Sequence, residues 1–88
     1  MNHLYLYAMN LQILLFGIAS ELVSANSLTM EMSTDASVSD LKILLVTKYP
    51  QLEKMNSYAI AVNEVYASNE TILKENDVVA IIPPVSGG

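Results

Sequence analysis

The stretch of the chain with the most distinctive chemistry is its C-terminal end, Pro83-Pro84-Val85-Ser86-Gly87-Gly88. The two prolines lack backbone donors and favour extended geometry, so they stop sheet pairing. Gly87 and Gly88 have no Cβ and can pass through a channel that is too narrow for other residues. The five residues Pro84 to Gly88 span roughly 17 Å when fully extended. We therefore predict a flexible tail over residues 84–88 that reaches out of the domain. The alternative is an ordinary frayed chain end.

Other residues that could perform chemistry are few. The chain has no cysteine, which excludes a disulfide framework, a thiolate zinc site and a cysteine nucleophile. Its single histidine, His3, lies near the N-terminus, and its nine aspartates and glutamates are scattered along the sequence. We interpret these carboxylates as solvated surface positions. We expect no bound metal, no bound cofactor and no nucleophile paired with a base.

The composition indicates one small acidic domain. Four lysines and no arginine stand against nine carboxylates, which gives a net charge of −5. This balance argues against a nucleic-acid partner, which needs a basic surface, and favours a basic protein partner. Of the 88 residues, 52% are hydrophobic and 15% are charged. Such a chain suffices for a single core and is not intrinsically disordered.

The N-terminal region has some features of a secretory signal. Residues 4–19 are nearly continuous apolar sequence, and Val23-Ser24-Ala25 resembles a signal-peptidase site. Against secretion, residues 1–3 contain no lysine or arginine, and the apolar stretch is shorter than the roughly 20 residues that span a bilayer. Cleavage after Ala25 would also remove the first predicted strand. We therefore expect a cytoplasmic protein without a membrane partner, in which residues 1–8 are a leader of unknown role and either Met1 or Met9 is the natural start.

Several elements that must position the tail are visible as sequence patterns. Residues 10–16 are apolar at nearly every position, which is typical of a central strand. Residues 28–33 alternate between apolar and polar side chains, as a strand with one solvated face does. Turn-forming residues and apolar runs predict the remaining elements: further strands at 58–62, 65–67 and 77–81, a turn at Asn63-Glu64, a short helix at 18–23 and a helical turn at 68–73.

The strongest helix signal begins at Ser37. Its side chain can cap the first turn, and Asp40 stands three residues later, in the capping-box position. Apolar residues then recur at helical spacing until Pro50 ends the pattern: Val38, Leu41, Leu44 and Leu45. We predict a helix that covers the core. The element order gives an α+β domain over residues 9–83, with a mixed sheet of four to five strands packed on one main helix.

This element order with a terminal Gly-Gly resembles the ubiquitin-like β-grasp fold. The ending Ile81-Ile82-Pro83-Pro84-Val85-Ser86-Gly87-Gly88 is similar to that of the small subunits of molybdopterin synthase, which are sulfur carriers for molybdenum-cofactor biosynthesis. Ala61-Val62-Asn63-Glu64 and Asn76-Asp77-Val78-Val79-Ala80 fit the same family. The resemblance covers about residues 9–88, and the ending Pro-Pro-Val-Ser-Gly-Gly is its most specific part.

The resemblance implies a carrier whose chemistry resides in partner enzymes, so the chain would be a non-catalytic subunit. In this family an ATP-dependent activating enzyme adenylates the terminal carboxylate, and sulfur then replaces one oxygen. The resulting thiocarboxylate delivers sulfur to precursor Z inside the large synthase subunit, with which the carrier forms a heterotetramer. Gly88 would carry the adenylate and the thiocarboxylate, at the end of a tail made of Pro84, Val85, Ser86 and Gly87.

The family also buries an apolar patch of its sheet against partner proteins. The corresponding residues here are Phe16, Tyr66 and Ile82. The alternative is that these three residues belong to the ordinary hydrophobic core.

Three other functions remain open at this point. The first is the sulfur carrier for the thiamine thiazole, which also ends in Gly-Gly but is usually shorter and lacks the Pro-Pro-Val lead-in. The second is a ubiquitin-like protein modifier, in which Gly88 would form an isopeptide bond to lysine. The third is a plain interaction domain with an incidental tail.

Overall fold

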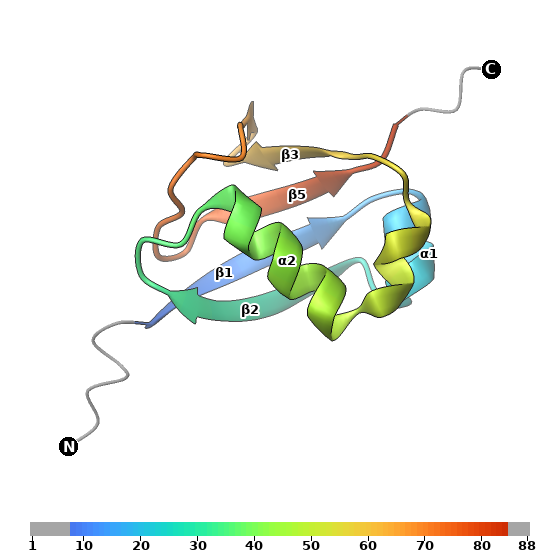
Figure 1. Cartoon of the computed structure of the whole chain (residues 1–88), viewed down its shortest axis with the longest axis horizontal. Coiled ribbons are helices and arrows are strands. Elements are labelled where there is room, and N and C mark those ends of the chain that lie inside the picture. Colours follow the sequence, from blue (N-terminus) through green and yellow to red (C-terminus); the bar gives the residue numbers. More distant parts are fainter. Residues whose placement is uncertain (1–7, 85–88) are drawn as a thin grey trace.

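The computed structural model describes residues 8 to 84 and contains a five-stranded sheet in the order β2-β1-β5-β3-β4. Strands β1 and β5 are parallel, and the other neighbours are antiparallel. The predicted α+β architecture with a mixed sheet is therefore confirmed (Figure 1). The elements in chain order are β1 (Ala8–Leu15), α1 (Ile18–Val23), β2 (Ser27–Ser33), α2 (Val38–Lys48), the 3-10 helix η2 (Pro50–Lys54), β3 (Ala59–Val62), β4 (Val65–Tyr66) and β5 (Val78–Ile82).

Helix α2 is the main helix and covers one face of the sheet (Figure 1). The predicted capping box is present. Ser37 Oγ accepts a hydrogen bond from the Asp40 amide at 3.2 Å, and Asp40 Oδ2 accepts one from the Ser37 amide at 2.9 Å. The helix buries one apolar stripe completely, as the helical spacing predicted: Val38, Leu41 and Leu45. These side chains pack against core residues of the two central strands: Leu11, Ile13, Leu15, Val79 and Ile81.

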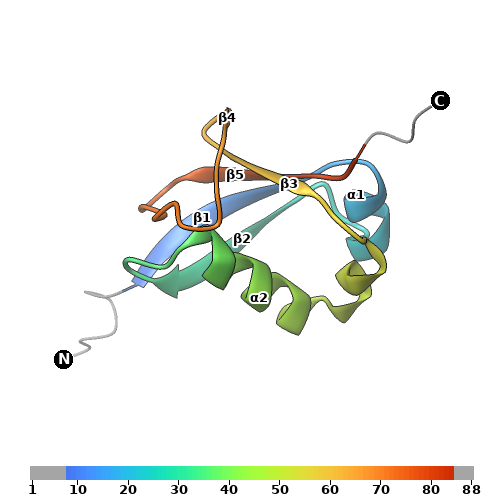
Figure 2. The same ribbon diagram turned by 45° about the horizontal axis from the view of Figure 1, so that its top comes forward.

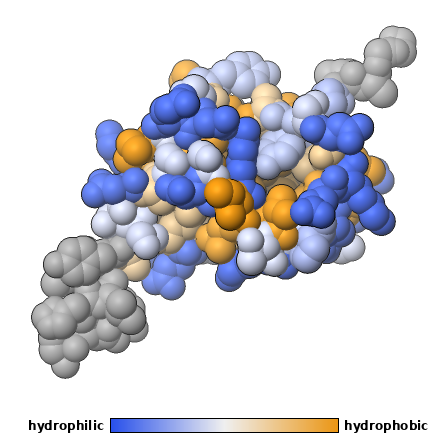
Figure 3. Space-filling model, viewed as in Figure 1, coloured by the Kyte–Doolittle hydropathy of each residue, from blue (hydrophilic) through white to orange (hydrophobic). Residues whose placement is uncertain are grey.

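The opposite face of the sheet carries no helix in the part of the chain that the structure describes. Figure 2 shows α2 on one side of the sheet and the β3–β4 hairpin rising from the other side. On the side that bears α2, polar residues surround the few exposed apolar ones (Figure 3). The uncovered face therefore remains as the place where side chains of the sheet are free to meet another protein.

Strand β1 begins earlier than predicted. It starts at Ala8, which pairs with Ser33, and Met9 pairs with Met32. Ala8, assigned to the leader in the sequence analysis, is therefore the first residue of the strand, because β2 extends far enough to pair with it. Residues 1–7, including His3, lie outside the described part of the chain.

The helical turn predicted at residues 68–73 was wrong. This segment has a turn at Asn69 and Glu70 and an isolated bridge between Ile72 and Ser37. Its backbone pairs with the residues around the start of α2, since the Val38 amide donates to the Thr71 carbonyl at 2.9 Å. One local bond, from the Thr71 amide to the Ser68 carbonyl at 3.1 Å, closes the turn, but tertiary hydrogen bonds prevent its continuation into a helix. The structure also adds η2, whose first residue Pro50 ends α2 as predicted.

Among residues 8 to 84, no helix has both the length and the apolar character needed to cross a membrane.

Candidate functional site

A row of cross-strand neighbours forms the centre of the uncovered sheet face. Ala61 on β3 is paired with Tyr66 on β4 and with Ala80 on β5. Ala80 is in turn paired with Leu14 on β1. Directly opposite residues of neighbouring strands point to the same face, so these four side chains form one row across four strands. The two alanines are small, which makes the middle of the row lower than its ends.

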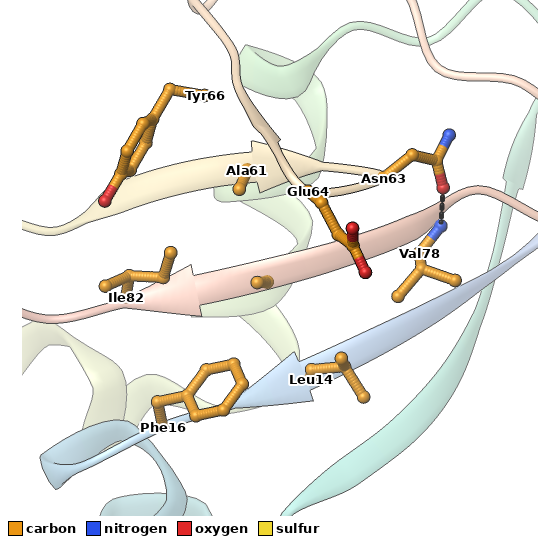
Figure 4. Close-up of a pocket in the computed structure, with 9 residues that line it drawn as sticks. Leu14, Phe16, Ala61, Asn63, Glu64, Tyr66, Val78 and Ile82 are labelled. Carbon is orange, nitrogen blue, oxygen red and sulfur yellow. Dashed lines mark hydrogen bonds between the residues drawn. The ribbon is translucent and has the colours of Figure 1, made fainter.

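This row is the floor of a groove with a volume of about 550 Å³. The side chains around the alanines come from β1, the β3–β4 hairpin and β5, and they point toward the same open space (Figure 4). We call it the open-face groove and define it by the residues that line it: Leu14, Phe16, Ala61, Asn63, Glu64, Tyr66, Val78, Ala80 and Ile82. Most of these side chains are apolar, so the groove suits an apolar protein surface better than a charged ligand.

The structure brings the three predicted interface residues together at this groove. Phe16 is 49% exposed and Tyr66 is 73% exposed, while Ile82 is half-buried. Fully buried core positions such as Ile81 and Val79 are 0% exposed. Phe16 and Tyr66 are therefore not core residues, which removes the alternative that the sequence left open for them. Large apolar side chains that gather on an exposed face are typical of a protein-binding site.

The groove is continuous with the start of the C-terminal tail. Because β1 and β5 are parallel, both end at the same edge of the sheet, beside α1 (Figure 1). At that edge the Phe16 amide donates to the Ile81 carbonyl at 3.3 Å. Ile82 lines the groove and is followed at once by half-buried Pro83 and exposed Pro84. A protein that covers the groove is thereby brought next to the point where the tail begins.

Gly17 gives the chain room to turn beside the start of the tail. Its φ is +54°, a conformation that side chains with a Cβ rarely adopt. A Cβ at this position would lie 3.8 Å from Pro83 Cγ. The glycine therefore lets β1 turn into α1 directly against Pro83. Pro84 is the only residue of the predicted tail within the described part of the chain; Val85, Ser86, Gly87 and Gly88 lie outside it.

Asn63 fixes the hairpin that carries Tyr66. Its side chain donates from Nδ2 to Asp77 Oδ1 at 2.9 Å. It also accepts at Oδ1 from the Val78 amide at 2.9 Å (Figure 4). Its own amide donates to the Val78 carbonyl at 2.8 Å. The predicted Asn63-Glu64 turn is confirmed, with φ values of 51° and 73°. The side chain of Asn63 thus attaches the turn to the first residue of β5.

Sequence reasoning missed the other groove residues and the bonding of Asn63 as parts of the site: Leu14, Ala61, Glu64, Val78 and Ala80. Leu14 was hidden because residues 13–16 are all apolar, so the alternation of polar and apolar residues over 10–13 stops before it. The period of two along a strand was the usable signal. It places Leu14 on the same face as Phe16 and opposite to Ile13 and Leu15, both of which are core residues.

The open-face groove contains one charged side chain, that of Glu64. Between residues 8 and 84, the structure holds no group of three or more histidine, aspartate or glutamate side chains that could bind a metal ion.

Comparison with known proteins agrees with this arrangement. The chain is 37% identical over 82 residues to an Arabidopsis thaliana protein named molybdopterin synthase sulfur carrier subunit, covering 92% of this chain and 85% of that protein. Two solved structures have the same ubiquitin-like β-grasp fold. Small archaeal modifier protein 1 from Methanosarcina acetivorans has a TM-score of 0.79 at 26% identity, covering 93% of this chain and 99% of the other.

The second structure is a complex of subunits 1 and 2 of the molybdopterin-converting factor from Helicobacter pylori. Its matching chain has a TM-score of 0.65 at 26% identity, covering 91% of this chain and all of the other. The sequence pattern of the ThiS family matches residues 13–88, which include all the residues that line the groove and the terminal glycines. The chain therefore belongs to the ThiS family.

Proposed function

We propose that this protein is the sulfur carrier subunit of a molybdopterin synthase. The observation that carries the proposal is the continuity of the open-face groove with the start of the tail, through Ile82 and Pro83. A carrier needs a surface that holds its partner and a chain end that reaches the partner's site, and here the two are adjacent. Relatives that are named molybdopterin synthase sulfur carrier subunit support the same assignment.

In the proposed cycle, the groove docks on the large subunit of the synthase, and the residues after Pro84 extend into that subunit. The terminal carboxylate of Gly88 first attacks ATP on an activating enzyme, which forms an acyl adenylate and releases pyrophosphate. A sulfur donor then displaces AMP and leaves a thiocarboxylate. Adenylation supplies the leaving group that a free carboxylate lacks. The thiocarboxylate is the species that would give its sulfur to precursor Z.

We further propose a heterotetramer of two carriers and two large subunits, working in the cytoplasm. The absence of cysteine from the sequence is compatible with a reducing compartment. The complex of the two Helicobacter pylori subunits supports a partner of the same kind for this chain.

The experiment that tests the function follows sulfur on the protein. The full chain is incubated with the activating enzyme, ATP and a sulfur source, and its intact mass is measured before and after. We expect exchange of one oxygen for sulfur at the C-terminus, and conversion of precursor Z when the large subunit is added. A carrier that acquires the thiocarboxylate and binds the large subunit, yet converts no precursor Z, would contradict the proposal.

The likeness to small archaeal modifier protein 1 favours one second candidate, attachment of Gly88 to lysine side chains. A blot of cell extract distinguishes the two functions. Covalent ladders that carry this chain indicate a modifier, whereas a single free species with a thiocarboxylate indicates a carrier.

A further inference from the structure

Glu64 occupies a backbone conformation that does not suit its residue type. It is the second residue of the two-residue turn between β3 and β4, because Val62 pairs with Val65. Both turn residues have positive φ, 51° at Asn63 and 73° at Glu64, which defines a turn of type I′. Such turns favour asparagine followed by glycine, because glycine alone meets no Cβ penalty there. A glutamate at this position costs backbone strain that a glycine would avoid, which points to a function for its side chain.

The carboxylate of Glu64 is placed over the open-face groove and has no partner in the described part of the chain. Figure 4 shows the side chain directed from the hairpin toward β5, across the hollow of the groove. No hydrogen bond or ion pair joins it to another residue between 8 and 84. Other carboxylates at this end of the sheet are engaged, since Glu75 accepts from the Asn10 amide and Asp77 accepts from Asn63 and from the Lys74 amide.

The charge of Glu64 is isolated within an otherwise uncharged groove. None of the four lysines lines it. When an apolar protein surface covers the groove, water leaves and an unpaired carboxylate becomes costly. A cation on the covering surface removes that cost, while a neutral or acidic surface leaves it in place. A buried or half-buried charge therefore discriminates between partner surfaces more than it adds to affinity.

We propose that Glu64 is the specificity-determining residue of the open-face groove and pairs with an arginine or lysine of the large synthase subunit. The occupant of the groove is then a patch of that subunit in which apolar side chains meet Phe16, Tyr66 and Ile82 and a cationic side chain reaches Glu64. The inference rests on the proposed function for the identity of the partner. The role of Glu64 itself rests on three observations: its charge is isolated, its side chain is directed into the groove, and its turn conformation is unfavourable.

The test compares two substitutions that remove the charge in different ways. Glu64→Gln keeps the size of the side chain, and Glu64→Gly removes the side chain and also suits the positive φ. Glu70→Gln is the matched control, because Glu70 is an exposed turn carboxylate that does not line the groove. Binding to the purified large subunit is measured by calorimetry at low and at high salt, and thermal unfolding is measured for each variant.

We expect both Glu64 variants to bind about tenfold more weakly than the wild type at low salt, and Glu70→Gln to bind normally. The affinity of the wild type should also fall more steeply with salt than that of Glu64→Gln, because salt screens the proposed ion pair. Glu64→Gly should melt at or above the wild-type temperature, since glycine fits the turn. Weaker binding in a variant that is no less stable separates recognition from folding.

The inference and the proposed function fail in different ways. If the wild type binds the large subunit and both Glu64 variants bind equally well with the same salt dependence, the charge has no role and the inference is wrong. If the wild type does not bind the large subunit at all, the proposed function itself is wrong. A Glu64→Gly variant that loses both stability and binding, beside a Glu64→Gln variant that keeps both, would assign Glu64 to the turn alone.

Discussion

At the scale of single residues, the proposed chemistry depends on a main-chain carboxylate at Gly88. Adenylation needs this group to be free, and each later step needs the chain end to lie where the partner enzymes act. Gly87 and Gly88 have no Cβ, which keeps the chain end narrow, and a Cβ on either residue would widen it.

Adding one residue after Gly88 should abolish sulfur transfer. The extension moves the carboxylate by about 3.5 Å, and a misplacement on the order of 1 Å already costs about a hundredfold in rate. A bulkier residue at Gly87 should have the same effect. Both variants should fold and still bind the large subunit, because docking uses the sheet face. Thiocarboxylate formation, followed by mass, and conversion of precursor Z are the measurements. Wild-type activity from a chain whose extension remains attached would remove Gly88 from the mechanism.

Phe16→Asp should weaken binding to the large subunit by about 2 kcal/mol or more, because buried apolar anchors dominate interface energies. Ile82→Asp should act in the same direction. Glu31→Lys, on exposed β2 surface away from the groove, should change the affinity little. Phe16 is 49% exposed in the free chain, so its variant should melt near the wild-type temperature. An unfolded Phe16→Asp chain would mean that this side chain supports the core after all.

At the scale of elements, the β3–β4 hairpin decides how Tyr66 is held at the open-face groove. The hairpin carries Tyr66 on a strand of only two residues, Val65–Tyr66. Such a strand has few ladder bonds of its own, so its position depends on the turn that precedes it.

Asn63→Ala should destabilise the protein by about 1 kcal/mol, because the Val78 amide and Asp77 lose their side-chain partner. Hydrogen exchange at Val65 and Tyr66 should rise more than elsewhere, since the hairpin is released from β5. Asn69→Ala is the control, because Asn69 also lies in an exposed turn but its side chain makes no hydrogen bond within the described residues. Equal exchange in both variants would show that the bonds of Asn63 do not hold the hairpin.

The partial burial of Tyr58, the residue before β3, predicts that stability depends on pH in the alkaline range. Burial raises the pKa of Tyr58 above its ordinary value of 10.0, and Lys42 Nζ lies 5.3 Å from the centre of its ring. The unfolded chain therefore loses the tyrosine proton first, so the free energy of unfolding falls as pH rises through about 10 toward the higher folded pKa. Tyr58→Phe should lessen this fall in urea titrations at several pH values. An unchanged slope in the variant would remove Tyr58 as the cause.

At the scale of the whole molecule, we expect the described domain to depend little on the residues before Met9. Met9 is 2% exposed and belongs to the core, whereas Ala8 adds one pair at the end of β1. A chain that begins at Met9 should therefore melt within a few degrees of the full chain, since it keeps the core and all ladder pairs except that with Ser33. Differential scanning calorimetry of both chains measures this. A large drop in Tm would show that residues 1–8 pack on the domain.

The sequence by itself determined the features that rest on local patterns. The capping box of Ser37 and Asp40 and the apolar spacing after it set α2, because both act within a few residues of chain. Asn63, which tolerates positive φ, marked the turn between β3 and β4, and the apolar run of residues 10–16 marked an inner strand of the sheet. The resemblance of the ending at Pro83 to Gly88 then indicated the family and directed attention to Phe16, Tyr66 and Ile82.

Only the tertiary structure decided which residues form the site, because strand pairing joins segments that are far apart in sequence. The register of β1, β5, β3 and β4 puts Leu14, Ala80, Ala61 and Tyr66 in one row, and no local pattern contains that register. The segment 68–73 was mispredicted for the same reason, since most of its backbone hydrogen bonds join it to residues around Ser37. The parallel pairing of β1 and β5 also places Phe16 beside the start of the tail, and so joins the groove to the chain end that it is proposed to serve.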